Sequence, residues 1–273
     1  MFNRKPYIVI TGGTRGLGFY TAQYLSKLGW NLIIVDISST ACSVYKENKN
    51  IKEVKSKLLN NNVVDFFFGD LTKEEKVKTI FNKIKKKYKR IDGLVAFAGG
   101  DISGSDIKAS GGKAKENNLF INKKEFSNIF ERNFLSTFYT LRNCIPVMQK
   151  AKKGRIVTIS SVLGTFGSYQ EFAYATSKST IIHLTRASAS YCREWNINVN
   201  CIAPSGITSG RFLKTLKSRS KHDLKRLNKK SRLLSFGYPE DVAKCVYFLL
   251  SDLSPFISGQ IIRLDGGELS TPI

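Results

Sequence analysis

A tyrosine and a lysine stand four residues apart in the stretch EFAYATSKSTIIHL, as Tyr174 and Lys178. Together they could exchange a proton with a substrate oxygen. Both groups titrate near pH 10 in water, so neither acts as an acid or a base at neutral pH without help from its surroundings. Residues four apart on a helix are ordinary neighbours on one face. The spacing therefore fits either a catalytic pair or plain helix surface, and the rest of the chain has to decide.

A glycine-rich turn, TGGTRGLG, runs from Thr11 to Gly18 after a strand-like run and opens a helical pattern. Glycines let the backbone approach a pyrophosphate, and the amino end of a helix offers free N–H groups and a positive dipole. Asp36 closes the next apolar run, where a carboxylate can accept both ribose hydroxyls of NAD and repel the extra phosphate of NADP. A plain tight turn and a turn aspartate are the alternatives, and the strand–turn–helix context favours a dinucleotide site.

Apolar runs of strand length alternate with helical patterns, which predicts βαβ units and a parallel sheet covered by helices on both faces. The expected strands are 7–11, 31–36, one within 62–70, 92–100, 154–160, 197–203 and 259–267. The expected long helices are 16–28, 123–150 and 172–195. No linker or internal repeat interrupts the rhythm, so we expect a single domain over 1–273.

Two polar segments break this alternation at the edge of the sheet where open α/β folds bind ligands. Residues 99–118 form an insertion rich in Gly, Ser and Lys, and a segment over about 205–236 is expected to cover the substrate as a lid. Within it, 211–232 carries ten Lys or Arg and one acidic residue, Asp223. A solvated amphipathic helix explains much of this charge, and an anionic substrate is the alternative hypothesis.

Bulk composition narrows the class of protein. The chain has 273 residues, 42% of them hydrophobic, and no apolar run is long enough to cross a membrane. No secretion signal opens it, and its five cysteines are scattered singly, so we expect free buried thiols in a cytoplasmic protein. With two histidines, a metal site is not expected. The formal charge of +23 follows lysines spread along the whole chain, which favours codon bias over a nucleic-acid partner.

Taken together, these motifs resemble the classical short-chain dehydrogenase/reductase family over nearly the whole chain. The wide TGxxxGxG turn of that family corresponds to Thr11, Gly12, Gly16 and Gly18. The family's catalytic set corresponds to Asn133 in FERNFLSTF, Ser161 in TISSVLG, and the YxxxK pair of Tyr174 and Lys178. The resemblance implies a doubly wound Rossmann fold with a seven-stranded, mostly parallel sheet of order 3-2-1-4-5-6-7.

The resemblance also implies which residues contact the dinucleotide. They are Gly12, Thr14, Arg15, Gly16, Leu17, Gly18, Asp36, Asp70, Leu71, Ala98, Gly99, Pro204, Ser205, Gly206, Ile207 and Ser209, together with Tyr174 and Lys178. Three positions depart from the family or complicate the choice of cofactor. The usual Asn-Asn-Ala-Gly reads AFAG at 96–99, the usual Pro-Gly turn carries Ser205, and Arg15 is a type that faces the 2′-phosphate in NADP-using relatives. We expect altered packing at 96–99. The carboxylate of Asp36 favours NAD over NADP.

By the same resemblance, Tyr174 is the acid–base group, and Lys178 together with a positively charged nicotinamide lowers its pKa. Lys178 also binds the nicotinamide ribose, Ser161 holds the substrate oxygen, and Asn133 helps to organise a water relay. Tyr169 and Tyr191, which have no lysine four residues on, are assigned to packing or the pocket rim.

We therefore expect an NAD(H)-dependent oxidoreductase that interconverts a secondary alcohol and a ketone on a polar small molecule of the sugar, cyclitol or hydroxy-acid type. An NADPH-dependent 3-ketoacyl-carrier-protein reductase is the alternative within the family. A non-catalytic NAD-binding sensor is a further alternative, disfavoured because the Asn, Ser, Tyr and Lys are all present. The family also implies a homotetramer or homodimer built on the helices at 123–150 and 172–195.

Overall fold

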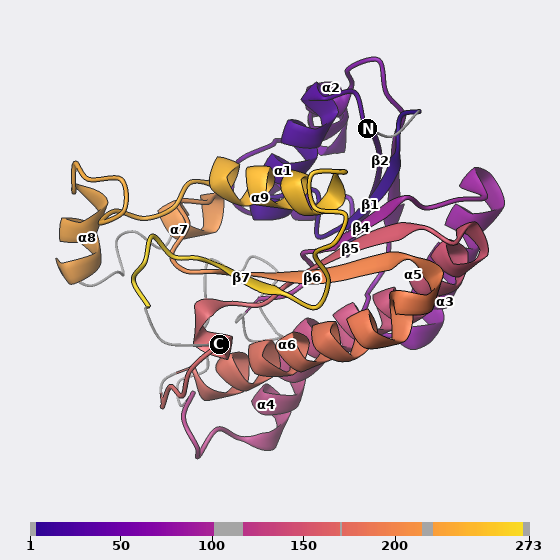
Figure 1. Ribbon diagram of the computed structural model, residues 1–273. Helices are drawn as coiled ribbons and strands as arrows, with labels where there is room; N and C mark the ends of the chain where they lie inside the picture. The colour runs from indigo at the N-terminus through magenta and orange to yellow at the C-terminus, as the bar shows by residue number, and fades with distance from the viewer. Residues whose placement is uncertain (1–3, 101–116, 170, 215–220, 270–273) are drawn as a thin grey trace.

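The computed structural model describes residues 4–100, 117–169, 171–214 and 221–269 (Figure 1). Its strands are β1 (Tyr7–Thr11), β2 (Asn31–Asp36), β3 (Val64–Phe68), β4 (Gly93–Ala96), β5 (Gly154–Ile159), β6 (Ile197–Pro204) and β7 (Ile261–Leu264). Its helices are α1 (Gly16–Lys27), α2 (Ile51–Leu58), α3 (Glu74–Tyr88), α4 (Lys123–Phe130), α5 (Ser136–Ala151), α6 (Phe172–Cys192), α7 (Gly210–Lys214), α8 (Lys221–Leu227) and α9 (Pro239–Leu250).

All seven strands pair in parallel, in the order β3-β2-β1-β4-β5-β6-β7. The predicted strand order is confirmed, and the sheet is wholly rather than mostly parallel. Helices α1, α2 and α9 cover one face, and α3, α5 and α6 cover the other (Figure 1).

Neighbouring residues of one strand enter two different cores, because successive side chains in a strand point to opposite faces. Ile8 and Ile10 of β1 pack in the core beneath α1 and α9, whereas Val9 between them packs in the core beneath α3 and α5. All three side chains are fully buried. A strand with helices on both faces has no solvent side, which is why these strands read as unbroken apolar runs.

The predicted long helix at 123–150 has the expected extent but is interrupted. One π-helical turn, Glu131–Leu135, separates α4 from α5. Such turns insert an extra residue into a helix and are frequent at functional sites.

The two polar segments are described only in part. Most of the 99–118 insertion, residues 101–116, lies outside the described residues. The segment expected to be a lid contributes α7 and α8, and its two ends meet where Ile207 pairs with Gly237. Across the described residues, no helix is long and apolar enough to span a bilayer. The five cysteines are free, and four of them are buried.

Candidate active site

The glycine turn brings the amino end of α1 against the carboxyl end of β1. The Gly12 N–H donates to the Val35 carbonyl at 2.8 Å, and Gly12 and Gly16 have left-handed φ values of 66° and 55°. A Cβ on Gly18 would lie 2.2 Å from the Gly12 carbonyl oxygen, closer than any side chain allows. Open space surrounds Gly16, where a Cβ would meet nothing within 4 Å. This turn therefore has the close backbone approach that a pyrophosphate cradle needs.

Asp36, the last residue of β2, is buried and aimed at this turn. Its Oδ2 accepts hydrogen bonds from the N–H of Thr14 at 3.0 Å and from the Thr14 hydroxyl at 2.7 Å. Its Oδ1 accepts from the N–H of Ile37 at 2.8 Å. Each carboxylate oxygen has two lone pairs, so Oδ2 is fully used, whereas Oδ1 can accept one further hydrogen bond, as from a ribose hydroxyl.

Arg15 lies beside the same aspartate. Its guanidinium stands 5.1 Å from the ring centroid of Tyr45, and both Arg15 and Asp36 shift the pKa of the Cys42 thiol electrostatically. The Nη1 atom of Arg15 is buried and has no hydrogen-bond partner among the described residues. Because a buried cationic N–H without an acceptor is unfavourable, this atom could donate to an additional phosphate.

Helix α6 carries Tyr174 in its first turn and Lys178 one turn later. The Nζ atom of Lys178 lies 5.6 Å from the centroid of the Tyr174 ring and donates to the Ile159 carbonyl at 2.9 Å. Ser161 follows β5, accepts from the N–H of Leu163 at 3.2 Å, and lies near enough to the phenol of Tyr174 to act on its pKa. The structure thus brings together the serine, tyrosine and lysine that the sequence singled out.

Burial shifts the proton affinities of the pair in opposite directions. Desolvation, assisted by the negative charge of Glu171, raises the pKa of Tyr174 to about 12, although the neighbouring Ser161 hydroxyl acts in the lowering direction. Desolvation lowers the pKa of Lys178 to about 8. In the protein alone the phenol is therefore held protonated at neutral pH, so the expected lowering of its pKa is not present without a bound nicotinamide.

Asn133 sits in the π-helical turn and is fully buried. Its Oδ1 accepts from the Gly100 N–H at 2.9 Å, and its Nδ2 donates to the carbonyls of Gly100 and Ile129 at 2.9 and 2.8 Å. A Cβ on Gly99 would lie 2.7 Å from Asn133 Oδ1 and 3.5 Å from Lys178 Nζ. Asn133 and Lys178 therefore converge on the segment that follows β4, and Gly99 leaves room for them.

The segments after β3 and β4 hold three more of the predicted cofactor residues. Asp70 accepts from the N–H and hydroxyl of Thr72 at 2.9 and 2.8 Å, and Leu71 is buried. The Thr11 hydroxyl accepts from the Ala98 N–H and the Thr11 carbonyl accepts from the Phe97 N–H, both at 3.2 Å, so Thr11 joins β1 to the segment after β4 where the family has asparagines.

The segment Pro204–Ser209 leaves the carboxyl end of β6 in a constrained path. The Ser205 N–H donates to the Leu264 carbonyl at 3.1 Å, and the Gly206 carbonyl accepts from the Gly237 N–H at 3.0 Å. A Cβ on Gly206 would lie 2.4 Å from the ring of Phe236, so this glycine is needed for packing. Ser205 takes the place of the family's glycine without disturbing these hydrogen bonds.

One residue at this site was missed from the sequence. Glu47 places one carboxylate oxygen 2.6 Å from the Gly16 nitrogen and the other 3.1 Å from the Gly210 nitrogen. It lies in an irregular stretch between β2 and α2, with no motif or periodicity that marks it.

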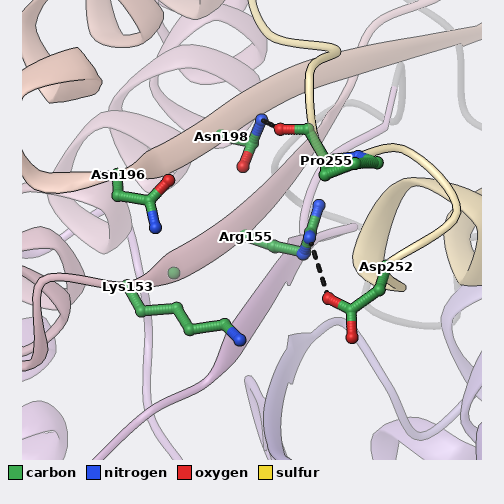
Figure 2. Close-up of a pocket in the computed structure, with 7 residues that line it drawn as sticks. Lys153, Arg155, Asn196, Asn198, Asp252 and Pro255 are labelled. Atoms are coloured by element: carbon green, nitrogen blue, oxygen red, sulfur yellow. Dashed lines mark hydrogen bonds and ion pairs between the residues drawn. The ribbon is translucent and has the colours of Figure 1, made fainter. Parts of the chain in front are cut away.

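A polar hollow of about 200 Å³ lies at the opposite end of the strands from this site (Figure 2). Arg155, near the start of β5, is paired there with Asp252 at 3.1 Å. Lys153, Asn196, Asn198 and Pro255 also line it. The hollow faces the amino ends of β5 and β6, whereas Ser161 and Pro204 lie at their carboxyl ends, so it is separate from the candidate active site.

The family of this chain follows from its similarity to known proteins. A family model described as short chain dehydrogenase matches residues 6–220. The chain belongs to the short-chain dehydrogenase family. Its membership accounts for the parallel sheet and for the glycine turn, and it makes the chain an oxidoreductase of the alcohol dehydrogenase and ketone reductase type.

Relatives within the short-chain dehydrogenase family differ in what they act on. The chain is 31% identical over 261 residues to the 3-oxoacyl-acyl-carrier-protein reductase FabG of Thermotoga maritima, covering 95% of this chain and 96% of that protein. It is 28% identical to the NAD-dependent glycerol dehydrogenase of Listeria innocua, covering 95% and 92%. The solved structure of ElxO with NADP bound is 30% identical, with a TM-score of 0.81 over 98% of this chain and 100% of that chain.

Proposed function

We propose that this short-chain dehydrogenase uses NAD(H) to interconvert a secondary alcohol and a ketone on a polar small molecule of the sugar, cyclitol or hydroxy-acid type. The observation that carries the proposal is Asp36. Its buried carboxylate is held toward the glycine turn by Thr14, where its Oδ1 can accept a ribose hydroxyl and where a 2′-phosphate would meet a fixed negative charge.

A bound nicotinamide supplies the hydride chemistry, and the chain supplies position and a proton route. Tyr174 exchanges a proton with the substrate oxygen, which Ser161 holds through its hydroxyl. Lys178, anchored on the Ile159 carbonyl, keeps a positive charge beside the phenol. Lys178 would act on the phenol together with the charge of a bound, oxidised nicotinamide, and both charges would lower the pKa of Tyr174 from its value in the protein alone. Asn133 is a positioning residue that holds the segment after β4 beside Lys178.

The choice of cofactor is tested by binding. Dissociation constants for NADH and NADPH are measured by fluorescence for the wild type and for Asp36→Asn, which removes the charge but keeps the shape. We expect the wild type to prefer NADH, and the variant to bind NADH about tenfold more weakly while NADPH binding improves, since hydrogen bonds to charged groups are the stronger ones. Equal affinities of the wild type for both dinucleotides would contradict the assignment.

A second candidate function is an NADPH-dependent 3-oxoacyl-acyl-carrier-protein reductase. Two observations favour it: the similarity to FabG of Thermotoga maritima, and the unpartnered Nη1 of Arg15 next to Asp36. A panel of sugars, cyclitols, hydroxy acids and 3-oxoacyl thioesters, assayed with NADH and NADPH in parallel, separates the two. Turnover confined to thioesters with NADPH would replace our first proposal with this one.

The basic segment after β6 supports an anionic substrate. In the described part of this segment Arg226 pairs with Glu268 and Arg232 with Asp241, whereas Lys225, Lys229 and Lys230 are exposed. We expect the triple change K225Q/K229Q/K230Q to raise KM in a salt-dependent manner. The matched control is K78Q/K83Q/K86Q, which removes three exposed lysines from α3. Equal KM values for the two triple variants would contradict an anionic substrate.

We also propose that the chain folds as one domain, acts in the cytoplasm, and assembles as a homotetramer or homodimer through the helices around α4, α5 and α6. Light scattering of the purified protein measures its mass. A monomer at micromolar concentration would contradict the assembly.

A further inference from the structure

Glu47 joins two parts of the chain that are remote in sequence. It lies in the segment 37–50 that connects β2 to α2. Its Oε2 accepts from the N–H of Gly16, the first residue of α1, at 2.6 Å. Its Oε1 accepts from the N–H of Gly210, the first residue of α7, at 3.1 Å. One carboxylate therefore ties the glycine turn to the beginning of the lid segment.

The Gly16 N–H is the donor that a dinucleotide pyrophosphate is expected to use. Arg15 is the N-cap residue of α1, and its side chain makes no capping hydrogen bond to the helix. The first turn of α1 contains no acidic residue. The amino end of this helix keeps its partial positive charge for an anion from elsewhere. In this structure that anion is the Glu47 carboxylate.

Several contacts hold Glu47 in this place. Lys57 of α2 donates to the Glu47 main-chain carbonyl at 3.1 Å and to the side chain of Asn48 at 2.9 Å. The ring of Tyr45 packs against Arg15 of the glycine turn. On the far side, a Cβ on Gly210 would lie 2.3 Å from Glu47 Oε1, so the carboxylate is packed directly on that glycine.

We propose that Glu47 is an internal competitor for the pyrophosphate of the dinucleotide, and that cofactor binding displaces it and releases the amino end of α7. The inference rests on the proposed dinucleotide binding. Two anions cannot share one N–H donor at hydrogen-bond distance without strong repulsion, so the carboxylate must leave Gly16 when a phosphate arrives. The same movement breaks the contact with Gly210, so the amino end of α7 is released after the cofactor binds and before the substrate does.

Binding of NADH tests this directly. Dissociation constants are measured for the wild type, Glu47→Ala, Glu47→Gln, and the control Glu240→Gln, an exposed residue of α9 paired with Lys244. We expect about tenfold tighter NADH binding for Glu47→Ala, a smaller gain for Glu47→Gln, and none for the control, since a charge-assisted hydrogen bond no longer has to be broken. Unchanged or weaker binding by both Glu47 variants would overturn the proposal while leaving the dinucleotide site intact. If neither the wild type nor the variants bind NADH or NADPH, both proposals fail.

Hydrogen–deuterium exchange on the unmodified protein gives a second readout that needs no variant. The amide of Gly210 is protected by Glu47 in the structure, so exchange in the peptide over 209–214 should rise about tenfold when NADH is added. In Glu47→Ala the same peptide should exchange quickly with or without NADH. Exchange that falls or stays constant in the wild type on NADH addition would contradict the release of α7.

Discussion

The ammonium group of Lys178 donates a 2.9 Å hydrogen bond to the main-chain carbonyl of Ile159, which anchors a lysine of α6 on the last residue of β5. This bond fixes the distance between the lysine and the Tyr174 ring, because both side chains rise from one helix whose position is set against the sheet. It also buries the charge, and burial lowers the pKa of Lys178 to about 8.

The first prediction concerns the pH dependence of stability. Between the folded pKa near 8 and the unfolded value near 10.4, the unfolded chain binds more protons at Lys178, so the free energy of unfolding rises with pH in this window. Relative to Lys178→Met, the wild type should gain up to about 3 kcal/mol between pH 7 and 10. Tyr174, whose folded pKa is raised to about 12, lowers the stability only above pH 10.

Urea unfolding of both proteins at pH 7, 8, 9 and 10 measures this gain. The unfolding free energies of wild type and Lys178→Met should diverge steadily across the series. Parallel curves would show that the ammonium is not desolvated as the structure indicates.

A second prediction separates chemistry from binding at Tyr174. Tyr174→Phe removes only the hydroxyl that exchanges a proton, so kcat should fall by about 10²–10⁴-fold while the NADH dissociation constant changes less than about twofold. Tyr191→Phe removes a hydroxyl near the other end of α6, where the side chain is 61% exposed, and should leave kcat unchanged. Comparable losses in the two variants would argue against Tyr174 as the proton donor.

The third prediction concerns Asn133 as a positioning residue. Asn133→Ala leaves the Gly100 N–H and carbonyl without their side-chain partner, which should lower the free energy of unfolding by about 2–4 kcal/mol and reduce kcat. Asn143→Ala, which removes a single bond to the Tyr139 carbonyl on α5, should cost less than about 1 kcal/mol. Thermal and urea unfolding give the stabilities. A kcat that stays at the wild-type level in Asn133→Ala would remove its role at the site.

A fourth prediction addresses the glycine turn. Gly18→Ala places a Cβ 2.2 Å from the Gly12 carbonyl, so α1 must shift, and NADH binding should weaken by at least about a hundredfold. Gly167→Ala adds the same methyl group where nothing lies within 4 Å, and should bind NADH as the wild type does. Calorimetric titration measures both affinities.

The fold was largely predictable, because the strands between two layers of helices are continuous apolar runs and the turn after β1 has a recognisable glycine spacing. Ser161, Tyr174 and Lys178 were found from their order along the chain, and the structure brings them together. The π-helical turn at Asn133 was not predicted, since one extra residue leaves no trace in a pattern of period 3.6. Glu47 was missed because its two contacts depend on the path of an irregular loop in space.

That extra residue at Asn133 links two requirements that a regular helix could not meet together. Winding the same residues as a regular α-helix, without the wider π turn, would rotate α5 about its axis relative to α4, because each α-helical residue adds about 100°. Such a helix could keep the amide of Asn133 beside Gly100, or it could keep Leu141, Cys144 and Met148 in the core, but it could not do both. The π turn therefore lets one continuous helix serve both the site and the core.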